Sequence, residues 1–371
     1  MPPGLHALIV GVSSYPHLPG RDEPPGPNAY GMGQLTGAAL AAAAMEDWLR
    51  ATDGRLTVPV RSVKTLLSPS AEELRIRPSL REAPLATFAA LRQAALDWQK
   101  ECAADPDGVA LFYFAGHGVQ RTRENQVLLL RDFAADAGDP LSYGVDLSNL
   151  VNGMAPTATN PRIARTQLWF VDACRSFPSA FDEYETLTAG TMLTTTLSDR
   201  DDRCAPIYFA ALPGGSAYGI PGEGTVFSRA LIECLEGAAG QKLGNANWSV
   251  TVGSLIAALQ EVVDADPDAG LQQVWSGGQV ARPGTTIVEL DRVPDVQVRL
   301  ELAPPARANG ISLRVSGPGG DVPVPAPLQP NPLLTSWPAG IYSFGADPPH
   351  DSIGHEQLAV MPPVFPWRKE I

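Results

Sequence analysis

The sequence predicts an α/β fold, with a doubly wound and mostly parallel sheet flanked by helices, followed by a small all-β appendage. Over roughly the first 290 residues, short apolar runs alternate with segments of helical period, which is the pattern of strand–helix repeats. The pattern changes near residue 293, since 15 of the 36 prolines fall in the last 79 residues. We therefore expect two domains, residues 1–292 and residues 293–371.

Apolar runs bounded by turn residues predict the strands of the sheet. The runs that predict them are His6–Ser13, Arg61–Leu67, Val109–Phe114, Gln167–Val171 and Ile207–Leu212, with a shorter one at Gln126–Leu130. Between these runs, apolar residues recur at intervals of three and four, which predicts helices. The predicted helices are Leu35–Leu49, Leu85–Cys102, Phe227–Leu235 and Val252–Val263, with a short one at Asp146–Met154.

Two segments predict long loops. Residues Tyr15–Gly33 are rich in Pro, Gly and Asn, and residues 177–203 carry few large apolar side chains. In the appendage, alternation of apolar and polar residues over Val296–Leu302 and Ile311–Val315 predicts strands with one solvated face. Trp337–Tyr342 predicts a strand pair packed by aromatic rings. After Pro348 the pattern leaves open whether the tail is ordered or loose.

Composition narrows the class of protein. With 27 Lys and Arg against 40 Asp and Glu, the net charge is −13, which argues against nucleic acid or an anionic membrane as a partner. The four cysteines are far apart and form no CxxC pair, so we expect reduced thiols rather than a zinc site or disulfide framework. The first apolar run is too short for a signal sequence or a membrane span. We expect a cytoplasmic protein without cofactor or metal.

Two of the predicted strands end on reactive side chains. Val109–Phe114 leads to His117, which has a glycine on each side, and Gln167–Val171 leads to Cys174. Because parallel strands bring their carboxyl ends to one edge of a sheet, an imidazole and a thiol would meet there. Such a pair can act as a thiolate nucleophile with a proton shuttle. Alone, a free cysteine is usually a small buried apolar residue and a lone histidine is usually structural, so only their pairing favours catalysis.

The order and spacing of these residues resemble a known family. Cys174 lies 57 residues after His117, within the string Asp172-Ala173-Cys174-Arg175-Ser176. The chain resembles a bacterial member of the caspase and metacaspase superfamily of cysteine peptidases. Further segments resemble that family's strands and helices and extend the resemblance over about residues 5–290. They are Ala7–Val12, Leu35–Ala38, Val127–Asp132, Ala210–Gly214, Ala217–Tyr218 and Gly224–Leu231.

The resemblance implies a cysteine endopeptidase that acts on proteins or peptides. Cys174 would attack the scissile carbonyl as a thiolate, and His117 would protonate the departing amine and later activate water. The backbone amides of Gly118 and Cys174 would form the oxyanion hole. In this family no third side chain is needed to orient the histidine, so none is assigned.

Asp172 is the residue that metacaspases carry two positions before the nucleophile, and those enzymes prefer Arg or Lys at P1. A carboxylate at the floor of the S1 pocket would pair with a guanidinium. The alternative is that Asp172 merely caps the turn after its strand. Metacaspases usually hold a second acid early in helix one, where this chain has Ala41, and Asp22 or Glu23 in the preceding loop are candidate substitutes.

Relatives are often cut in the loop that corresponds to residues 177–203. For an Arg-specific enzyme, Arg200 and Arg203 are candidate self-cleavage points, although a solvated charged loop explains them equally well. We expect regulation by a partner protein, by an activating protease or by the appendage. Bacterial caspase-like enzymes often act in stress or phage defence, which the resemblance suggests here by analogy alone.

Two rival functions stay open at this point. The chain could be a catalytically inactive caspase-like scaffold that binds proteins. Ala41 favours this function, because metacaspases usually have an acidic residue at that position. It could also be another Cys/His hydrolase, such as an amidase or thioesterase, which would need a carboxylate after the cysteine and a compact pocket. The long loop at 177–203 favours a peptide substrate over the second rival.

Overall fold

A computed structural model describes residues 2–20, 30–120, 125–136, 138–157, 161–178, 187–194, 201–242, 244, 247–308 and 310–371. The chain divides into two compact units. The first comprises Met1–Ile232 and Asp266–Pro283, and the second comprises Glu233–Ala265 and Gly284–Ile371. The domain boundary predicted between residues 292 and 293 lies inside the second unit and stays a prediction.

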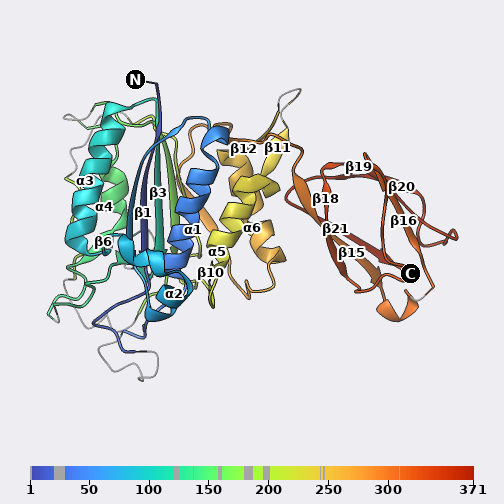
Figure 1. Ribbon diagram of the computed structural model, residues 1–371, viewed down its shortest axis with the longest axis horizontal. Helices are drawn as coiled ribbons and strands as arrows, with labels where there is room; N and C mark the ends of the chain where they lie inside the picture. Colours follow the sequence, from blue (N-terminus) through green and yellow to red (C-terminus); the bar gives the residue numbers. More distant parts are fainter. Residues whose placement is uncertain are drawn as a thin grey trace. The chain divides into compact units, whose positions relative to one another are not determined.

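The first unit is built on a six-stranded sheet in the order β13-β8-β7-β3-β1-β2 (Figure 1). Its strands are β1 (Leu5–Val12), β2 (Val60–Ser68), β3 (Val109–Gly116), β7 (Thr166–Ala173), β8 (Ala205–Phe209) and β13 (Trp275–Gln279). Only β13, at one edge, runs antiparallel to its neighbour among these strands. The predicted fold class is thereby confirmed. The sequence did not predict β13, because its Gly277-Gly278 pair interrupts any apolar alternation.

Helices cover both faces of this sheet. Figure 1 shows α3 (Phe88–Ala104) and α4 (Leu147–Gly153) on one side, and α1 (Ala38–Ala51) and α5 (Val226–Glu233) on the other. Successive strand residues point to opposite faces, so alternate side chains of β3 and β7 share a core with α3. The other face receives α1, whose alanines allow close approach: a Cβ on Gly11 would lie 2.7 Å from that of Ala42.

A short helix that the sequence did not predict supports the start of α1. Helix α2 (Ala71–Ile76) begins with a capping box in which Ser70 and Glu73 bond each other's backbone amides. Glu73 is fully buried, and its Oε1 accepts hydrogen bonds from Ser13 Oγ at 2.9 Å and from the amide of Ala39 at 3.0 Å. The carboxylate therefore satisfies amides at the N-terminus of α1, where a negative charge is favourable.

Replacing Glu73 by alanine is expected to lower the free energy of unfolding by about 3 kcal/mol, because buried donors lose their acceptor. Urea-induced unfolding followed by tryptophan fluorescence measures the change. Glu82→Ala is the matched control, since Glu82 is exposed on the turn that follows α2. Equal stability of the two variants would contradict this account of Glu73.

The second unit contains α6 (Val252–Ala265) and a three-stranded sheet in the order β11-β12-β14, with strands Gly240–Lys242, Trp248–Thr251 and Thr286–Glu289. It also contains two further sheets that share one hydrophobic core, in the orders β18-β15-β21 and β17-β16-β19-β20. Their strands are β15 (Asp295–Ala303), β16 (Leu313–Gly317), β17 (Gly320–Val322), β18 (Leu333–Pro338), β19 (Gly340–Ala346), β20 (Glu356–Val360) and β21 (Val364–Glu370).

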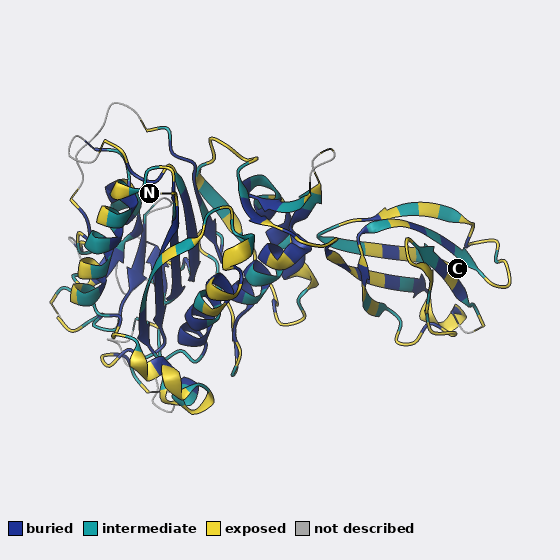
Figure 2. Ribbon diagram, turned by 45° about the horizontal axis from the view of Figure 1, so that its top comes forward, coloured by how far each residue is buried: buried dark blue, intermediate teal, exposed yellow. Residues whose placement is uncertain are grey.

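The alternation predicted for this part of the chain is present. Along β15, buried and exposed residues alternate, and Figure 2 shows the same banding on the ribbon of these sheets. The rings of Trp337 and Tyr342 stack with centroids 5.2 Å apart, as expected for the predicted aromatic strand pair. The segment after Pro348, left open by the sequence, is ordered and supplies β20 and β21.

Smaller elements complete the fold. A three-stranded sheet of β4 (Gly118–Gln120), β5 (Gln126–Leu129) and β6 (Gly144–Asp146) follows β3, and β9 (Gly219–Ile220) pairs with β10 (Gly224–Thr225). Single turns are 3₁₀ at Asp53–Arg55, Pro78–Glu82 and Pro305–Arg307, and π-helical at Cys234–Ala238. Of the helices that the structure describes, none combines the length and apolar character that crossing a membrane requires.

Candidate active site

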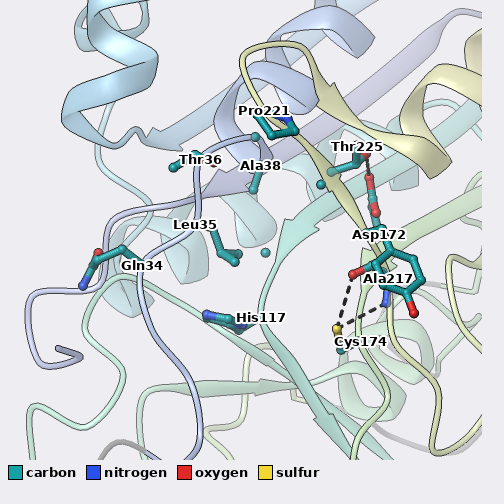
Figure 3. A pocket seen from close by; sticks show the side chains of 14 residues that line it. Gln34, Leu35, Thr36, Ala38, His117, Asp172, Cys174, Ala217, Pro221 and Thr225 are labelled. Atoms are coloured by element: carbon teal, nitrogen blue, oxygen red, sulfur yellow. Dashed lines mark hydrogen bonds between the residues drawn. The ribbon is translucent and has the colours of Figure 1, made fainter. Parts of the chain in front are cut away.

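A cleft of about 290 Å³ opens at the carboxyl edge of the central sheet, within the first unit (Figure 3). Its walls come from the segment before α1, from the ends of β3 and β7, and from the segment between β8 and α5. The lining residues that bear on the chemistry are Gln34, His117, Asp172, Cys174, Ala217 and Thr225. Three residues singled out in the sequence, His117, Cys174 and Asp172, thus lie in one cleft.

Strand register places the histidine and the cysteine at the same edge. β3 and β7 are parallel neighbours, and Gly116 lies opposite Ala173 at the end of the pairing. His117 and Cys174 each follow directly. Gly116 has φ +159°, and a Cβ there would lie 2.9 Å from both the Phe114 ring and the Tyr15 hydroxyl. Only glycine fits this turn, which explains why a glycine precedes His117.

The Cys174 side chain contacts the backbone of Ala217. Its Sγ accepts a hydrogen bond from the Ala217 amide at 3.3 Å and lies 3.7 Å from the Ala217 carbonyl oxygen, to which the thiol donates (Figure 3). Burial raises the pKa of the Cys174 thiol, and the Ala217 amide offsets part of this rise. The raised pKa favours the neutral thiol form of Cys174 at pH 7.

His117 is oriented by a backbone carbonyl. Its Nε2 lies 2.7 Å from the carbonyl oxygen of Gly33. Because a carbonyl can only accept, Nε2 carries the hydrogen and Nδ1 keeps the lone pair. Burial lowers the pKa of His117, partly offset by the Gly33 bond, so the imidazole is neutral at pH 7. The hydrogen-bond partner that the structure shows for the ring is thus the main-chain carbonyl of Gly33.

A neutral thiol beside a neutral imidazole has a measurable consequence. Iodoacetamide should alkylate Cys174 slowly at pH 7, with a pH midpoint above the ordinary thiol value of about 8.5. Mass spectrometry of the alkylated peptide across pH 6–10 measures this, with Cys174→Ala as the background control, since Cys102, Cys204 and Cys234 are buried. A reaction already at its plateau near pH 6 would instead reveal a preformed thiolate–imidazolium pair.

The backbone around Gly118 suits the predicted oxyanion hole. The Leu129 amide donates to the His117 carbonyl at 2.9 Å, so Gly118 and Leu128 form a non-hydrogen-bonded pair. The Gly118 amide therefore points away from β5, toward the segment that follows Cys174, where Val119 bridges Ser176. A Cβ on Gly118 would lie 2.6 Å from the Cys174 carbonyl oxygen. Gly118 therefore lies close to the backbone of Cys174, and an oxyanion hole formed by their two amides stays a prediction.

Asp172 is buried at the wall of the cleft. Its Oδ2 accepts hydrogen bonds from the Tyr113 hydroxyl at 3.0 Å and from the Thr225 hydroxyl, whereas its buried Oδ1 has no hydrogen-bond partner among the described residues. Burial raises the pKa of Asp172 to about 7, and the two hydroxyl bonds limit the rise. The hydrogen bonds found here go to side chains of β3 and β10 rather than to the turn after β7, so they give no support to a capping role.

The other predicted S1 residues cannot be placed in the same way. Asp22 and Glu23 lie outside the described residues, as does Arg200. Ala41 is buried in α1, with its Cβ 3.6 Å from the position a Cβ would take on Gly224. Among the residues that the structure describes around the cleft, Asp172 is the acidic side chain in the lining.

Arg203, the second candidate cleavage point, is buried. Its Nη2 pairs with Asp201 at 2.6 Å, and its Nη1 donates to the Val151 carbonyl at 3.0 Å and to Gln167 Oε1 at 3.1 Å. The side chain is 5% exposed. Cleavage after Arg203 therefore requires this segment to unfold locally first. The alternative expectation, a solvated charged loop, does not fit Arg203, because its side chain is buried.

Sequence reasoning missed several residues of the site. Gly33 and Tyr15 contact His117, and Tyr113 and Thr225 bond Asp172. None of them belongs to a motif with fixed spacing. Tyr15 and Gly33 lie at the two ends of the loop that the sequence predicted from composition alone, and the contacts that define their roles span 84 to 102 residues.

Comparison with known proteins identifies a family. The model of the caspase domain family matches residues 5–275. The uncharacterized protein y4kE of Sinorhizobium fredii is 26% identical over 229 residues, covering 59% of this chain and 62% of that protein, so the chain spans less than two thirds of this relative.

Two crystal structures are also similar. Caspase-1 from Spodoptera frugiperda has a TM-score of 0.45 at 14% identity, covering 78% of this chain and 91% of its own. A Geobacter sulfurreducens protein has a TM-score of 0.44 at 15% identity, covering 77% of this chain and 100% of its own. The family model matches well over half of the chain, from β1 to the first residue of β13, with His117 and Cys174 inside the match, so the chain belongs to the caspase domain family of cysteine peptidases.

Proposed function

We propose that this protein is a metacaspase-like cysteine endopeptidase that hydrolyses peptide bonds after Arg or Lys. The observation that carries the proposal is the content of one cleft: a thiol, an imidazole with a free basic nitrogen, and a buried carboxylate oxygen without a partner among the described residues. The first two groups supply the chemistry, and the third supplies recognition of a cationic P1 side chain.

In the proposed mechanism, the substrate carbonyl enters between Cys174 and the Gly118 amide. His117 Nδ1 takes the thiol proton as Sγ attacks the carbonyl carbon, and the oxyanion that forms is bound by the amides of Gly118 and Cys174. The imidazolium then gives its proton to the departing amine, and the C–N bond breaks to leave a thioester. Water, deprotonated by His117, hydrolyses the thioester and returns the thiol.

The Gly33 carbonyl accepts the hydrogen bond from His117 Nε2 in every step of this cycle. It holds the Nε2 hydrogen at 2.7 Å, so Nδ1 remains the nitrogen that exchanges the proton. When Nδ1 is protonated, the same carbonyl dipole stabilises the positive ring. A neutral resting pair also means that the proton moves only when substrate is bound, which keeps the free thiol protected from oxidation.

Recognition of P1 rests on Asp172. A guanidinium that enters the cleft would donate to Oδ1, the acceptor that the described residues leave unpaired, while Tyr113 and Thr225 hold Oδ2. An ion pair of this kind lowers the pKa of the carboxyl group, because the charged form gains a partner. Because Oδ2 already accepts from two hydroxyls, the contact at Oδ1 is a single charge-assisted hydrogen bond, which either Arg or Lys can make.

The remaining elements of the proposal rest on the family resemblance. Cleavage within residues 177–203, at Arg200 or after local release of Arg203, would activate the enzyme, and a bacterial stress or defence pathway would be its setting. The substrates would be proteins, and an activating protease or regulatory protein would be a partner. The second unit would contribute regulation or substrate recruitment.

An inactive caspase-like scaffold is the alternative, and the observation that favours it is the buried Ala41 at the position where metacaspases usually carry a second acid. A peptidyl-arginyl chloromethyl ketone separates the two, because it binds the S1 pocket and reacts with the nucleophile only when the site is assembled. Covalent labelling of Cys174 supports the peptidase. An intact protein that folds normally and stays unlabelled supports the scaffold.

A peptide-library cleavage profile tests the function directly. Purified protein, before and after limited self-digestion, should cleave after Arg and Lys, and Cys174→Ala should cleave nothing. Cleavage after apolar or acidic residues would retain the peptidase and overturn the P1 assignment. No cleavage in any library would overturn the proposal as a whole. An Arg200→Ala variant shows whether turnover after self-digestion depends on that bond.

A further inference from the structure

Among the described residues between β1 and α1, the Gln34 side chain bonds the backbone of several others. Gln34 Oε1 accepts from the Tyr15 amide at 2.8 Å, and Gln34 Nε2 donates to the Tyr15 carbonyl at 2.7 Å and to the Leu18 carbonyl at 3.0 Å. A single amide group thus pairs with both backbone polar groups of Tyr15, as a neighbouring strand would. This bonding fixes the two ends of the loop against each other.

Tyr15 in turn holds His117. The tyrosine is fully buried, and its ring centroid lies 4.9 Å from that of the imidazole. Its hydroxyl accepts from the His117 amide at 2.8 Å and donates to the Leu129 carbonyl at 3.3 Å. Burial raises the pKa of Tyr15, so the hydroxyl remains a donor across the working range of pH. Both the main chain and the ring of His117 are thereby in contact with one residue.

We infer that Gln34 and Tyr15 are positioning residues that hold His117 in its Nε2–H tautomer with Nδ1 free for the thiol, an inference that rests on the proposed peptidase function. The contacts named above form the Gln34–Tyr15 brace. It acts on His117 from two directions: Tyr15 bonds the histidine directly, and Gln34 lies next to Gly33, whose carbonyl binds Nε2.

Additional contacts are needed at this site because the backbone on either side of His117 does not by itself determine the orientation of the imidazole ring. The residue lies between two glycines, and glycine leaves the backbone freer than any other residue. The hydrogen bond that the structure shows for its ring goes to a loop carbonyl rather than to a carboxylate. The direction of that carbonyl depends on the peptide plane between Gly33 and Gln34, which the Gln34 side chain anchors. A misplacement of 1 Å at a reacting group costs about 10²-fold in rate.

The inference predicts the same defect from two substitutions at separate places. Tyr15→Phe keeps the ring and removes the hydroxyl, and Gln34→Met keeps the approximate shape and removes every polar contact. Each variant should lower kcat for arginyl peptides about 10²-fold while KM changes less than about threefold. The split is expected because Asp172, the group proposed to bind P1, is held by Tyr113 and Thr225 rather than by the brace.

Matched controls exist in the chain. Tyr342→Phe removes a hydroxyl that donates to the Pro338 carbonyl at 2.8 Å, in the second unit. Gln99→Met removes an amide that donates to the Gly153 carbonyl at 2.6 Å. Both controls lose the same kinds of hydrogen bond without touching His117. They should keep wild-type kcat and KM at temperatures below their unfolding transitions.

A spectroscopic test separates this inference from the proposed function. Long-range ¹H–¹⁵N spectra of protein labelled at its five histidines report the tautomer of each ring, and His117→Ala assigns the His117 signal. Wild type should show the Nε2–H pattern, and Tyr15→Phe and Gln34→Met should show a mixture with Nδ1–H. If both folded variants retain the pure Nε2–H pattern, Gln34 and Tyr15 do not set the tautomer of His117, and the inference is wrong even if peptides are cleaved. Absence of peptide cleavage by wild type would overturn the function while these spectra still decide the brace.

Discussion

Cys174→Ala is expected to lower kcat/KM for arginyl peptides by about 10⁴-fold or more, because Cys174 supplies the thiol among the described residues that line the cleft with His117. The loss should fall on kcat, since the Asp172 pocket remains intact. Fluorogenic peptides with Arg at P1, assayed under initial-rate conditions, give both constants. The thermal unfolding temperature should barely change, because the thiol makes two long hydrogen bonds to a single backbone residue.

His117→Ala provides the second arm of this test. It should cause a loss of similar size, and the Cys174→Ala, His117→Ala double variant should be no worse than either single one, because the two groups act as one unit. Cys174→Ser is the conservative control and should also be inactive, since a hydroxyl is a far weaker nucleophile at this pH. Additive losses in the double variant would show that the two residues act in separate steps, and residual turnover in Cys174→Ala would end the peptidase account.

The strands that carry these two residues were predictable because they are short apolar runs. Val109–Phe114 and Gln167–Val171 are buried on both faces in a parallel sheet, so nearly every residue is apolar and the run ends sharply at a polar side chain. The helix predicted from Leu85 begins instead at Phe88, because Thr87 caps it through the Ala90 amide. Terminal residues of elements are set by such local bonds rather than by periodicity.

The parts of the site that sequence could not supply depend on contacts across the chain. Thr225 reaches Asp172 over 53 residues, and Tyr15 reaches His117 over 102. Hydroxyl and main-chain partners carry no spacing rule, because their positions follow from how the elements pack. Glu73 is an intermediate case: the pattern Ser70-x-x-Glu73 is a capping box in the sequence, but α2 is too short to show helical period.

The lowered pKa of His117 and the raised pKa of Asp172 together predict how the proposed peptidase activity responds to pH. Burial holds the pKa of His117 below its ordinary value, so the basic imidazole is lost on acidification only below the pH range usual for histidine. Asp172 changes charge at about pH 7. Two separate acid limbs are therefore expected for arginyl substrates. The decrease in kcat/KM near pH 7 reflects protonation of Asp172 and weaker binding of the P1 side chain. The decrease at lower pH reflects protonation of His117 and loss of the catalytic base.

Asp172→Asn is expected to lower kcat/KM for P1 arginine about 10²- to 10³-fold, because a buried cation loses its charged partner. A substrate with citrulline at P1 is the matched control, since citrulline has nearly the shape of arginine without its charge. Selectivity for arginine over citrulline should fall toward unity in the variant. For wild type, kcat/KM for arginine should rise through about pH 7 as Asp172 ionises, and both the citrulline substrate and the variant should lack this limb.

The same substitution separates recognition from stability. The folded-state pKa of Asp172, about 7, lies above the unfolded value of about 3.9, so the native state holds its proton longer. Between those values the unfolded chain binds fewer protons, and the stability of wild type falls as pH rises. The asparagine side chain of the variant carries no such charge, so the variant should melt at an equal or higher temperature than wild type at pH 8. A variant that loses arginine selectivity only together with stability would show that Asp172 supports the fold rather than P1. Retained selectivity in a stable variant would place the P1 determinant elsewhere in the cleft.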